Sequence, residues 1–328
     1  VMGYVAISTY MLVINETNIN GYIVNVFHTA IFYSIFRLKT EKMEAFMTFL
    51  CKVMGGLLLV SIPAFFLYLV GFPFVGVDAV YGDDLYSYTN YFLFMIDDRT
   101  LWAFFPRFSS VFLEPGHLGT AATLLLSTQF GKWKKWYNIV LLVALLLTFS
   151  LAAYVIYVVV IFLKLWVQRK QFIGKLIMMV AFISTIVVGS FFYNNGENLL
   201  HDLILIRLEV EDGVTEDFDT DFEKLCESSA VIFGKKRENP EFGNSGYKVF
   251  IYENGIVGTV LMLIFYIASL GKIRDRRATA SAFILALLGF IVRGYPLWYS
   301  NYLTYYDLAH EAPPLPDDAG KKKKEKEK

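Results

Sequence analysis

Long uninterrupted apolar runs constrain this 328-residue chain more than any other feature of its sequence. Residues 46–70 and 247–270 form two such runs, and each is long enough to cross the roughly 30 Å hydrocarbon core of a bilayer as a helix. Hydrophobic residues make up 56% of the chain and charged residues only 18%, whereas soluble proteins usually carry about a quarter charged residues. The sequence therefore predicts an all-α fold, a polytopic transmembrane helical bundle, rather than soluble domains.

The apolar pattern predicts about eight to ten helices in a single transmembrane domain over residues 1–310. The aromatic segment 295–309 is short for a span and fits an interfacial or partial helix with a Trp/Tyr belt. Residues 311–328 are rich in proline and then lysine, which predicts a disordered tail. The opening "VMGYVAIS" has neither a basic flank nor a cleavage site, so we expect further spans to precede it. The clear helices are expected over residues 1–14, 22–36, 46–70, 115–130, 136–148, 151–167, 176–193, 247–270 and 278–292.

Basic residues in the short loops predict how the bundle is oriented. Alternation of the spans places the four basic loops on one side, and the positive-inside rule makes that side cytoplasmic. Two long loops, roughly 71–114 and 194–246, then face the extracytoplasmic side, and the second is strongly acidic. The basic loops are residues 37–44, 131–135, 168–170 and 271–277.

The segment "RFSSVFLEPGHLG" (107–119) places three ionisable side chains where a span begins. Glu114 followed by proline is typical of a helix start, because proline lacks the N–H that a first turn leaves unused and an acidic residue faces the positive end of the helix dipole. Arg107, Glu114 and His117 are therefore expected to cluster at the outer face. Taken alone, the same residues also fit an Arg–Glu pair that only holds the loop to the helix cap.

Two local structures are expected on the outer side. Ser150 lies between two short apolar halves, which predicts a tight helical hairpin that is either the floor of an extracytoplasmic cavity or a plain serine-capped turn. In the first long loop, "YTNYFLFMI" (88–96) and "WAFFPRFSSVFL" (102–113) are expected to pair as a β-hairpin across "DDRT".

Further candidate binding residues lie in the second long loop and after the last clear helix. Basic side chains in an otherwise acidic loop could attract a phosphate, and the "GNSGY" helix start suits close approach of backbone to a ligand. A solvated charge run, a capped helix start and snorkelling at an interface are the simpler interpretations. The residues are Arg207, Lys235, Lys236, Arg237, Asn244, Ser245, Tyr247 and Arg293.

No nucleotide-binding, zinc-protease or serine-hydrolase motif occurs in the sequence, and the two cysteines, Cys51 and Cys226, have no metal spacing. We therefore expect neither a cofactor nor a metal, and a substrate that is activated elsewhere and presented at the outer membrane face. A lipid-linked diphosphate sugar fits, because arginine can hold a diphosphate bidentately as it leaves. A glutamate or histidine could deprotonate an acceptor hydroxyl.

The motifs "RFSSVFLEPGHLG", "FSLAAY" and "GNSGYKVFIYENGIVG", in this order over roughly residues 92–258, resemble the O-antigen polymerase and ligase superfamily. The resemblance implies a GT-C-like, metal-independent glycosyltransferase of the bacterial inner membrane that joins undecaprenyl-diphosphate-linked glycans on the periplasmic side. It implies that Arg107 contacts the diphosphate, with Glu114 at the acidic or amide position of the motif "R-x-x-[GS]-x-F-x-[EN]-P". Arg207 matches an arginine of the large loop more loosely.

One departure from the family bears on which member the chain resembles. Ligases carry a histidine at the end of the large loop, where this chain has Asn244 or Ser245. This favours a polymerase of O-antigen or capsular polysaccharide, with Glu114 or His117 as the base. An O-antigen ligase that transfers polymer to lipid A core, and a lipid-linked glycan transporter or flippase, remain the alternatives. The expected partners are the lipid-linked glycan, the bilayer, a chain-length regulator and a flippase, and not nucleic acid.

Overall fold

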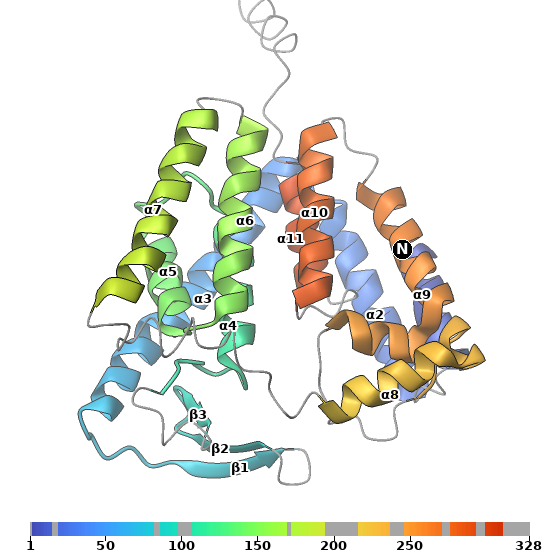
Figure 1. The fold of residues 1–328 in the computed structure, drawn as a ribbon, viewed down its shortest axis with the longest axis horizontal. Helices are drawn as coiled ribbons and strands as arrows, with labels where there is room; N and C mark the ends of the chain where they lie inside the picture. The colour runs from blue at the N-terminus through green and yellow to red at the C-terminus, as the bar shows by residue number, and fades with distance from the viewer. Residues whose placement is uncertain are drawn as a thin grey trace, which may run out of the picture.

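The computed structural model describes residues 2–14, 19–81, 86–97, 106–168, 172–193, 216–236, 246–270, 276–292 and 299–310. These residues are mostly helical (Figure 1). The helices are α1 (Met2–Ile14), α2 (Ile19–Phe36), α3 (Thr40–Leu69), α4 (Pro115–Thr128), α5 (Trp136–Leu147), α6 (Leu151–Gln168), α7 (Phe172–Phe192), α8 (Glu216–Glu227), the short 3-10 helix η6 (Ser229–Ile232), α9 (Gly246–Leu270), α10 (Arg276–Val292) and α11 (Tyr299–His310).

Each apolar run expected to be helical is helical in the structure, with its ends shifted by a few residues, but α9 is interrupted at Gly255. The largest shift is at α3, which begins at Thr40 because Glu41 in its first turn favours the positive end of the helix dipole. By length and composition, two helices of the described residues could cross a membrane, Glu41–Leu69 in α3 and Tyr247–Leu270 in α9. The aromatic C-terminal segment forms the short helix α11, while the tail 311–328 lies outside the described residues.

The first long loop contains an antiparallel sheet of β1 (Val77–Tyr81), β2 (Tyr86–Asn90) and β3 (Met95–Asp97), in that order. The expected hairpin between residues 88–96 and 102–113 is found only in part: the first run folds back on itself as β2 and β3, and Met95 N–H donates to the Ser110 carbonyl oxygen (2.8 Å) of the second run. The chain reverses earlier than expected, since the Asn90 side chain accepts a hydrogen bond from Phe92 N–H (2.8 Å) and Phe92 adopts a left-handed φ of 64°. Residues 98–105 lie outside the described residues.

Helix α4 lies between two hydrophobic cores. On one side, Leu118 and Leu126 pack with α3 and α5 and with Phe108 of the first long loop. On the other side, Leu124 packs with residues of α6, α9, α10 and α11. Since α4 joins both cores, its two ends are fixed relative to most of the bundle.

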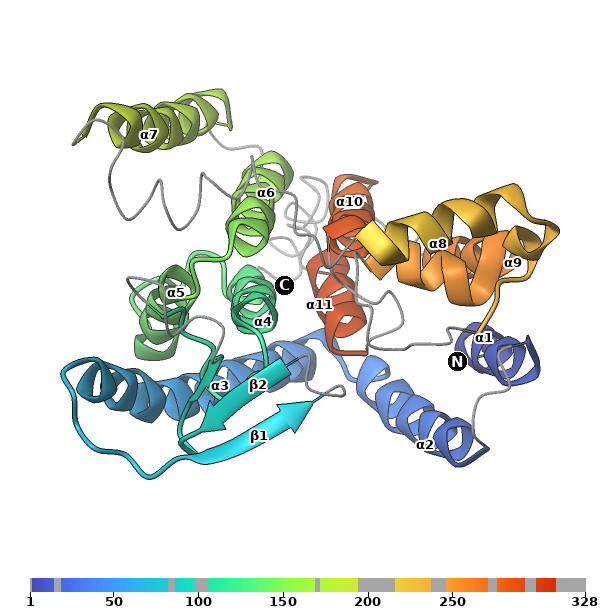
Figure 2. The ribbon, with the colours of Figure 1, turned by 60° about the horizontal axis from the view of Figure 1, so that its bottom comes forward.

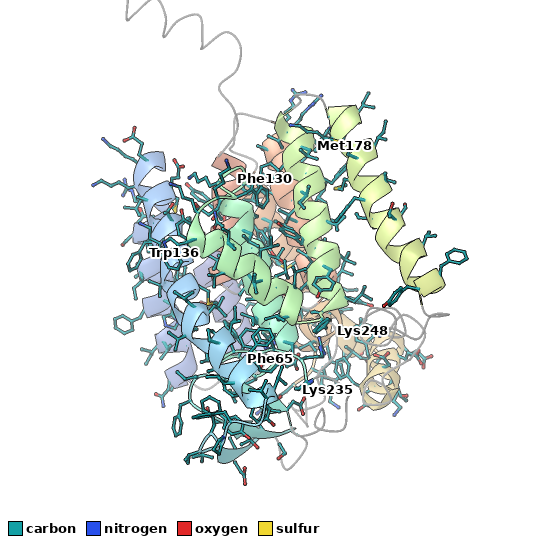
Figure 3. All side chains as sticks on the ribbon, turned by 90° about the vertical axis from the view of Figure 1, so that its left-hand side faces the viewer. Phe65, Phe130, Trp136, Met178, Lys235 and Lys248 are labelled. Atoms are coloured by element: carbon teal, nitrogen blue, oxygen red, sulfur yellow. The ribbon has the colours of Figure 1, made fainter. Side chains whose placement is uncertain are left out.

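The two ends of the helical bundle differ in the segments that they carry (Figure 1), and we call the end with the basic segments the basic end. At one end, Lys132 Nζ lies 2.6 Å from a Glu44 carboxylate oxygen, and Arg277 donates to the Trp166 carbonyl oxygen (3.3 Å). The first contact joins two of the basic segments, and the second joins the start of α10 to the last turn of α6. The sheet and α8 lie at the opposite end (Figure 1), which we call the loop end. Figure 3 shows Lys235 and Lys248 towards the same end as Phe65, and Phe130 towards the other.

Apolar side chains cover the outside of several helices. Helix α7 packs against α6 at the margin of the bundle (Figure 2), and its Ile173, Met178 and Phe182 are each about two thirds exposed or more. Helix α2 likewise exposes Ile19 and Phe27 to more than 60% of their surface. Helices that are apolar on all sides are stable in the core of a large protein or in a membrane, not in water.

Candidate functional site

Arg107 is fixed at the loop end of the bundle by contacts to backbone atoms. Its Nε donates a hydrogen bond to the Thr148 carbonyl oxygen, 2.9 Å away. The next residue, Phe108, donates its backbone N–H to the Leu147 carbonyl oxygen (3.1 Å), and its buried ring lies 5.1 Å from that of Phe65. Arg107 is half-buried, and the segment that carries it is held against the end of α5.

The turn from α5 to α6, residues 148–150, is the tight hairpin expected around Ser150. Phe149 adopts a left-handed φ of 45°, a conformation that costs a non-glycine residue on the order of 1–3 kcal/mol. The Thr148 hydroxyl accepts the Ser150 N–H (3.3 Å), and the Ser150 hydroxyl accepts the Ala153 N–H (3.4 Å), as in a serine-capped turn. Arg107 is thus bonded to a strained turn whose own polar groups are paired.

Ser110 is a second strained residue in this region. Its φ is 51°, its side chain is fully buried, and its hydroxyl has no hydrogen-bond partner among the described residues. The Ser110 carbonyl oxygen accepts the Met95 N–H (2.8 Å), and the Ser109 hydroxyl donates to the Met95 carbonyl oxygen (3.0 Å). The segment after Arg107 is therefore bonded to β3 on one side while Phe108 bonds it to α5 on the other.

Helix α4 begins at Pro115, as the sequence predicts. Glu114 occupies the N-cap position with extended backbone, but its carboxylate makes no capping hydrogen bond. Gly119, one turn inside the helix, brings α4 close to the α5–α6 turn: a Cβ at this position would lie 2.6 Å from Ala153 Cβ and 3.2 Å from Thr148 Oγ1. Gly119 of α4 and Arg107 therefore both lie against Thr148, while the half-buried Glu114 and His117 lie one turn nearer the start of α4.

Only part of the second group of candidate residues can be placed. Lys235 and Lys236 follow η6 and are exposed at the loop end, and Lys235 N–H donates to the Tyr252 carbonyl oxygen (2.7 Å). Tyr247 is half-buried in the first turn of α9, with its ring 6.4 Å from that of Phe290. Arg207, Arg237, Asn244, Ser245 and Arg293 lie outside the described residues.

The acidic stretch of the second long loop includes the amphipathic helix α8. Its buried Phe218 and Leu225 pack against Val249 and Tyr252 of α9, while Asp221 and Glu223 face solvent. The simpler interpretation of this stretch, a run of charges exposed to solvent, is therefore correct for the outer face of α8. Sequence reasoning missed Lys248, whose Nζ lies 2.7 Å from an Asp219 carboxylate oxygen and joins α9 to α8.

The expectation of one continuous helix over 247–270 is wrong at Gly255. This residue has φ 63° and ψ −170°, so two helical halves meet at a break. The preceding Asn254 forms an Asn-Gly pair with it, a turn signal that the apolar run concealed.

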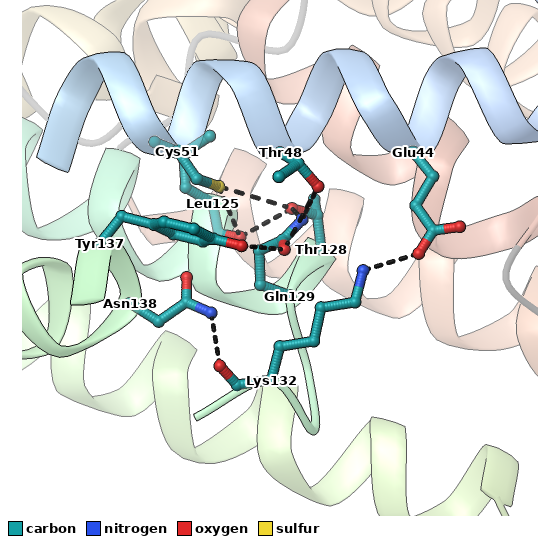
Figure 4. Close-up of polar contacts among 9 residues, drawn as sticks. All are labelled: Glu44, Thr48, Cys51, Leu125, Thr128, Gln129, Lys132, Tyr137 and Asn138. Carbon is teal, nitrogen blue, oxygen red and sulfur yellow. Dashed lines mark hydrogen bonds and ion pairs between the residues drawn. The ribbon is translucent and has the colours of Figure 1, made fainter. Parts of the chain in front are cut away.

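The basic end of the bundle contains a buried polar network (Figure 4). Gln129, only 1% exposed, donates to the Thr48 hydroxyl (3.3 Å) and accepts from the Tyr137 hydroxyl (3.5 Å). A pocket of about 390 Å³ on α3 adjoins this network, with Thr48 in its wall, and so lies far from Arg107. Its lining groups Glu44 and Thr48 are already paired with Lys132 and Gln129, and we therefore regard this region as structural.

Among the described residues, no group of three or more His, Cys, Asp or Glu side chains is placed to hold a metal ion. Comparison with known proteins gives no relative: no protein-family model matches the chain, and neither a curated sequence nor a solved structure is significantly similar to it.

Proposed function

We propose that the chain is a polysaccharide polymerase of the bacterial inner membrane. It joins undecaprenyl-diphosphate-linked repeat units of O-antigen or capsular polysaccharide on the periplasmic face, without a metal or cofactor. The observation that carries the proposal is the Arg107 guanidinium, held by Nε on the carbonyl oxygen of Thr148, a residue that also lies against α4 at Gly119. The fixed cation, two candidate bases and backbone strain occur together at one end of an apolar bundle.

The distribution of apolar surface supports the membrane setting. The outward sides of α2, α3 and α7 expose large apolar side chains, which lipid tails would cover at no cost in hydration. The described parts of the basic segments lie at one end of the bundle, and the sheet and α8 lie at the other (Figure 1). If the basic end is cytoplasmic, Arg107 faces the periplasm.

The chemistry uses the fixed cation of Arg107 together with the carboxylate and imidazole in the first turn of α4. In the transfer, a hydroxyl of the acceptor repeat unit attacks the anomeric carbon of the donor glycan. The bond from that carbon to the diphosphate oxygen breaks, and its electron pair stays with the diphosphate. Arg107 stabilises the charge that develops on the diphosphate, and Glu114 or His117 takes the proton of the hydroxyl. A guanidinium anchored before substrate binds needs little reorganisation during the reaction.

One observation favours a second candidate. Breaks within apolar helices, such as the break at Gly255, are typical of transporters, where half-helix ends face the transported group. In this chain the break is covered by η6 and its flanks, and the carbonyl oxygens of Tyr252 and Asn254 have protein partners. The polymerase therefore explains the ionisable residues at the loop end better than a lipid-linked glycan transporter does.

The test is a glycan ladder from cells that lack this gene and then regain it, in wild-type form or as Arg107→Ala. Loss of one preorganised donor typically lowers a transfer rate by about 100- to 1000-fold, so Arg107→Ala should give single-repeat glycans only. Arg277→Ala, an arginine at the basic end, is the matched control and should retain the ladder. Long chains at normal abundance of Arg107→Ala would contradict the proposal, and unattached lipid-linked polymer in the deleted strain would indicate a ligase.

A further inference from the structure

The break in α9 interrupts the backbone hydrogen bonding of the helix at Asn254, which is fully buried. The left-handed φ of Gly255 ends the first half of the helix at Asn254. The last carbonyl groups of the first half then have no partner within the helix. Since unpaired polar backbone is costly away from water, another part of the chain has to meet these groups. Residues 229–236, which we call the strap, do so.

The strap is inserted into the break by close backbone contact. Gly234 and Gly255 both have left-handed φ, 86° and 63°, and they face each other. A Cβ on Gly234 would lie 2.5 Å from the Glu253 carbonyl, and a Cβ on Gly255 would lie 2.5 Å from Gly234 N. Lys235 N–H donates to the Tyr252 carbonyl oxygen across the same contact (2.7 Å). Only glycine at both positions permits this approach.

Tyr10 of α1, more than 200 residues away in sequence, joins the two sides of the break. Its hydroxyl lies 2.9 Å from the Phe233 carbonyl oxygen in the strap and 2.9 Å from the Asn254 carbonyl oxygen, where the first half of α9 ends. One hydroxyl proton is thus shared between the strap and α9. Removing the Tyr10 hydroxyl leaves both carbonyl groups without this donor and loosens the strap on α9.

The strap leads directly into two of the candidate diphosphate-binding residues. Lys235 and Lys236 follow Gly234 and are both exposed, and Lys235 lies at the loop end of the molecule (Figure 3). Because the Lys235 backbone is bonded to Tyr252, the direction of both side chains is set by how the strap is seated. Two adjacent lysines on a fixed backbone suit two phosphate groups in series, as in a diphosphate.

We propose that Tyr10 is a positioning residue that holds the strap in the break of α9 and so presents Lys235 and Lys236 to the diphosphate of the lipid-linked glycan. The inference rests on the proposed polymerase function. It goes beyond that function because it assigns substrate binding to contacts between α1, the strap and α9, none of which includes Arg107. Tyr10 itself touches no substrate.

The first experiment measures the strap directly, by hydrogen exchange of the full chain in detergent. Tyr10→Phe keeps the ring and removes the hydroxyl, and exchange at the amides of residues 229–236 should become at least several-fold faster. Tyr22→Phe is the matched control, since the Tyr22 hydroxyl contacts Thr9 in α1 and not the strap.

The same measurement tests whether the strap binds diphosphate. Inorganic diphosphate should slow strap exchange in the wild type but not in a Lys235→Ala/Lys236→Ala variant. Unchanged exchange in Tyr10→Phe, or protection by diphosphate without the lysines, would overturn the inference.

The second experiment follows polymerisation of a purified lipid-linked repeat unit. Loss of one hydrogen bond of ordinary strength should raise KM about three- to tenfold in Tyr10→Phe with little change in kcat. Gly234→Ala, which unseats the strap from the other side, should do the same. Adding Tyr10→Phe to Lys235→Ala/Lys236→Ala should raise KM no further, because the lysines that Tyr10 positions are gone.

The two proposals fail in different ways. A wild-type protein that makes no polymer from the lipid-linked unit contradicts the polymerase and leaves the exchange experiment to decide the role of Tyr10. A wild type that polymerises, with Tyr10→Phe faster in exchange but unchanged in KM, overturns the positioning role alone. Additive effects of Tyr10→Phe and the lysine substitutions would overturn it as well.

Discussion

At its N-terminal end α4 meets a turn whose backbone is strained, whereas at its C-terminal end it meets α3 and α5 through side chains in a paired network. Around the first end, Phe149 and Ser110 are left-handed and the Ser110 hydroxyl is buried without a partner among the described residues. Around the second, Gln129 exchanges hydrogen bonds with Thr48 and Tyr137 (Figure 4).

The difference separates two roles of polar groups in one helix. A satisfied buried network rigidifies the packing around it, and losing a member costs stability. Strained backbone lowers stability and persists where the surrounding structure holds it, often at functional sites. The comparison therefore predicts that substitutions at the first end of α4 affect activity more than stability, and that those at the second end do the reverse.

The largest effect is expected from the candidate bases. Glu114→Gln keeps the shape of its side chain, and His117→Gln replaces the imidazole by a neutral amide of similar length. The substitution that removes the base should lower the transfer rate by about 100-fold or more. Glu114→Gln removes the charge that favours the positive end of the helix dipole, and this should cost about 1 kcal/mol or less in stability. Initial rates and thermal unfolding of each purified variant measure both quantities. If neither substitution lowers the rate, the base is another group and this end of α4 has only a structural role.

A smaller effect on activity is expected from Gly119→Ala. The added methyl group meets Ala153 and Thr148 and pushes α4 away from the turn that holds Arg107. We expect roughly tenfold less polymer, together with a loss of about 1–3 kcal/mol in stability from overpacking. Gly56→Ala in α3 is the control, since nothing lies within 4 Å of its new Cβ. Normal polymer with lowered stability would mean that the contact between α4 and the turn does not position Arg107.

The smallest effect on activity is expected from Gln129→Ala at the other end of α4. Removing this side chain leaves the Tyr137 hydroxyl without this acceptor and should lower stability by about 1–3 kcal/mol. Polymer formed per folded molecule should stay at the wild-type level, as measured by a glycan ladder normalised to protein in the membrane. A lost ladder at full abundance would show that the basic end takes part in function and would remove the contrast between the two ends.

The sequence predicts the helices better than it predicts the site because the two depend on different information. Apolar runs and Pro115 mark helices locally, so the start of α4 and the hairpin at Ser150 could be located from the sequence. The partner of Arg107 is a carbonyl oxygen 41 residues away, which no side-chain pattern encodes.

Two errors have the same origin. The break at Gly255 depends on a strap from another loop, and the pairing of β3 depends on a turn that Asn90 closes. In both regions a tertiary or turn contact overrides the local apolar pattern.

The break in α9 also affects the lipids around the protein. In the membrane setting proposed above, the half of α9 that follows the break, residues 256–270, rises about 22 Å at about 1.5 Å per residue. Helix α5, with 12 residues, rises about 18 Å. Both are shorter than the roughly 30 Å hydrocarbon core, and a bilayer meets short helices by thinning around them. The outer leaflet would then dip beside α5 and α9, which lowers the diphosphate of a lipid carrier towards the level of Arg107.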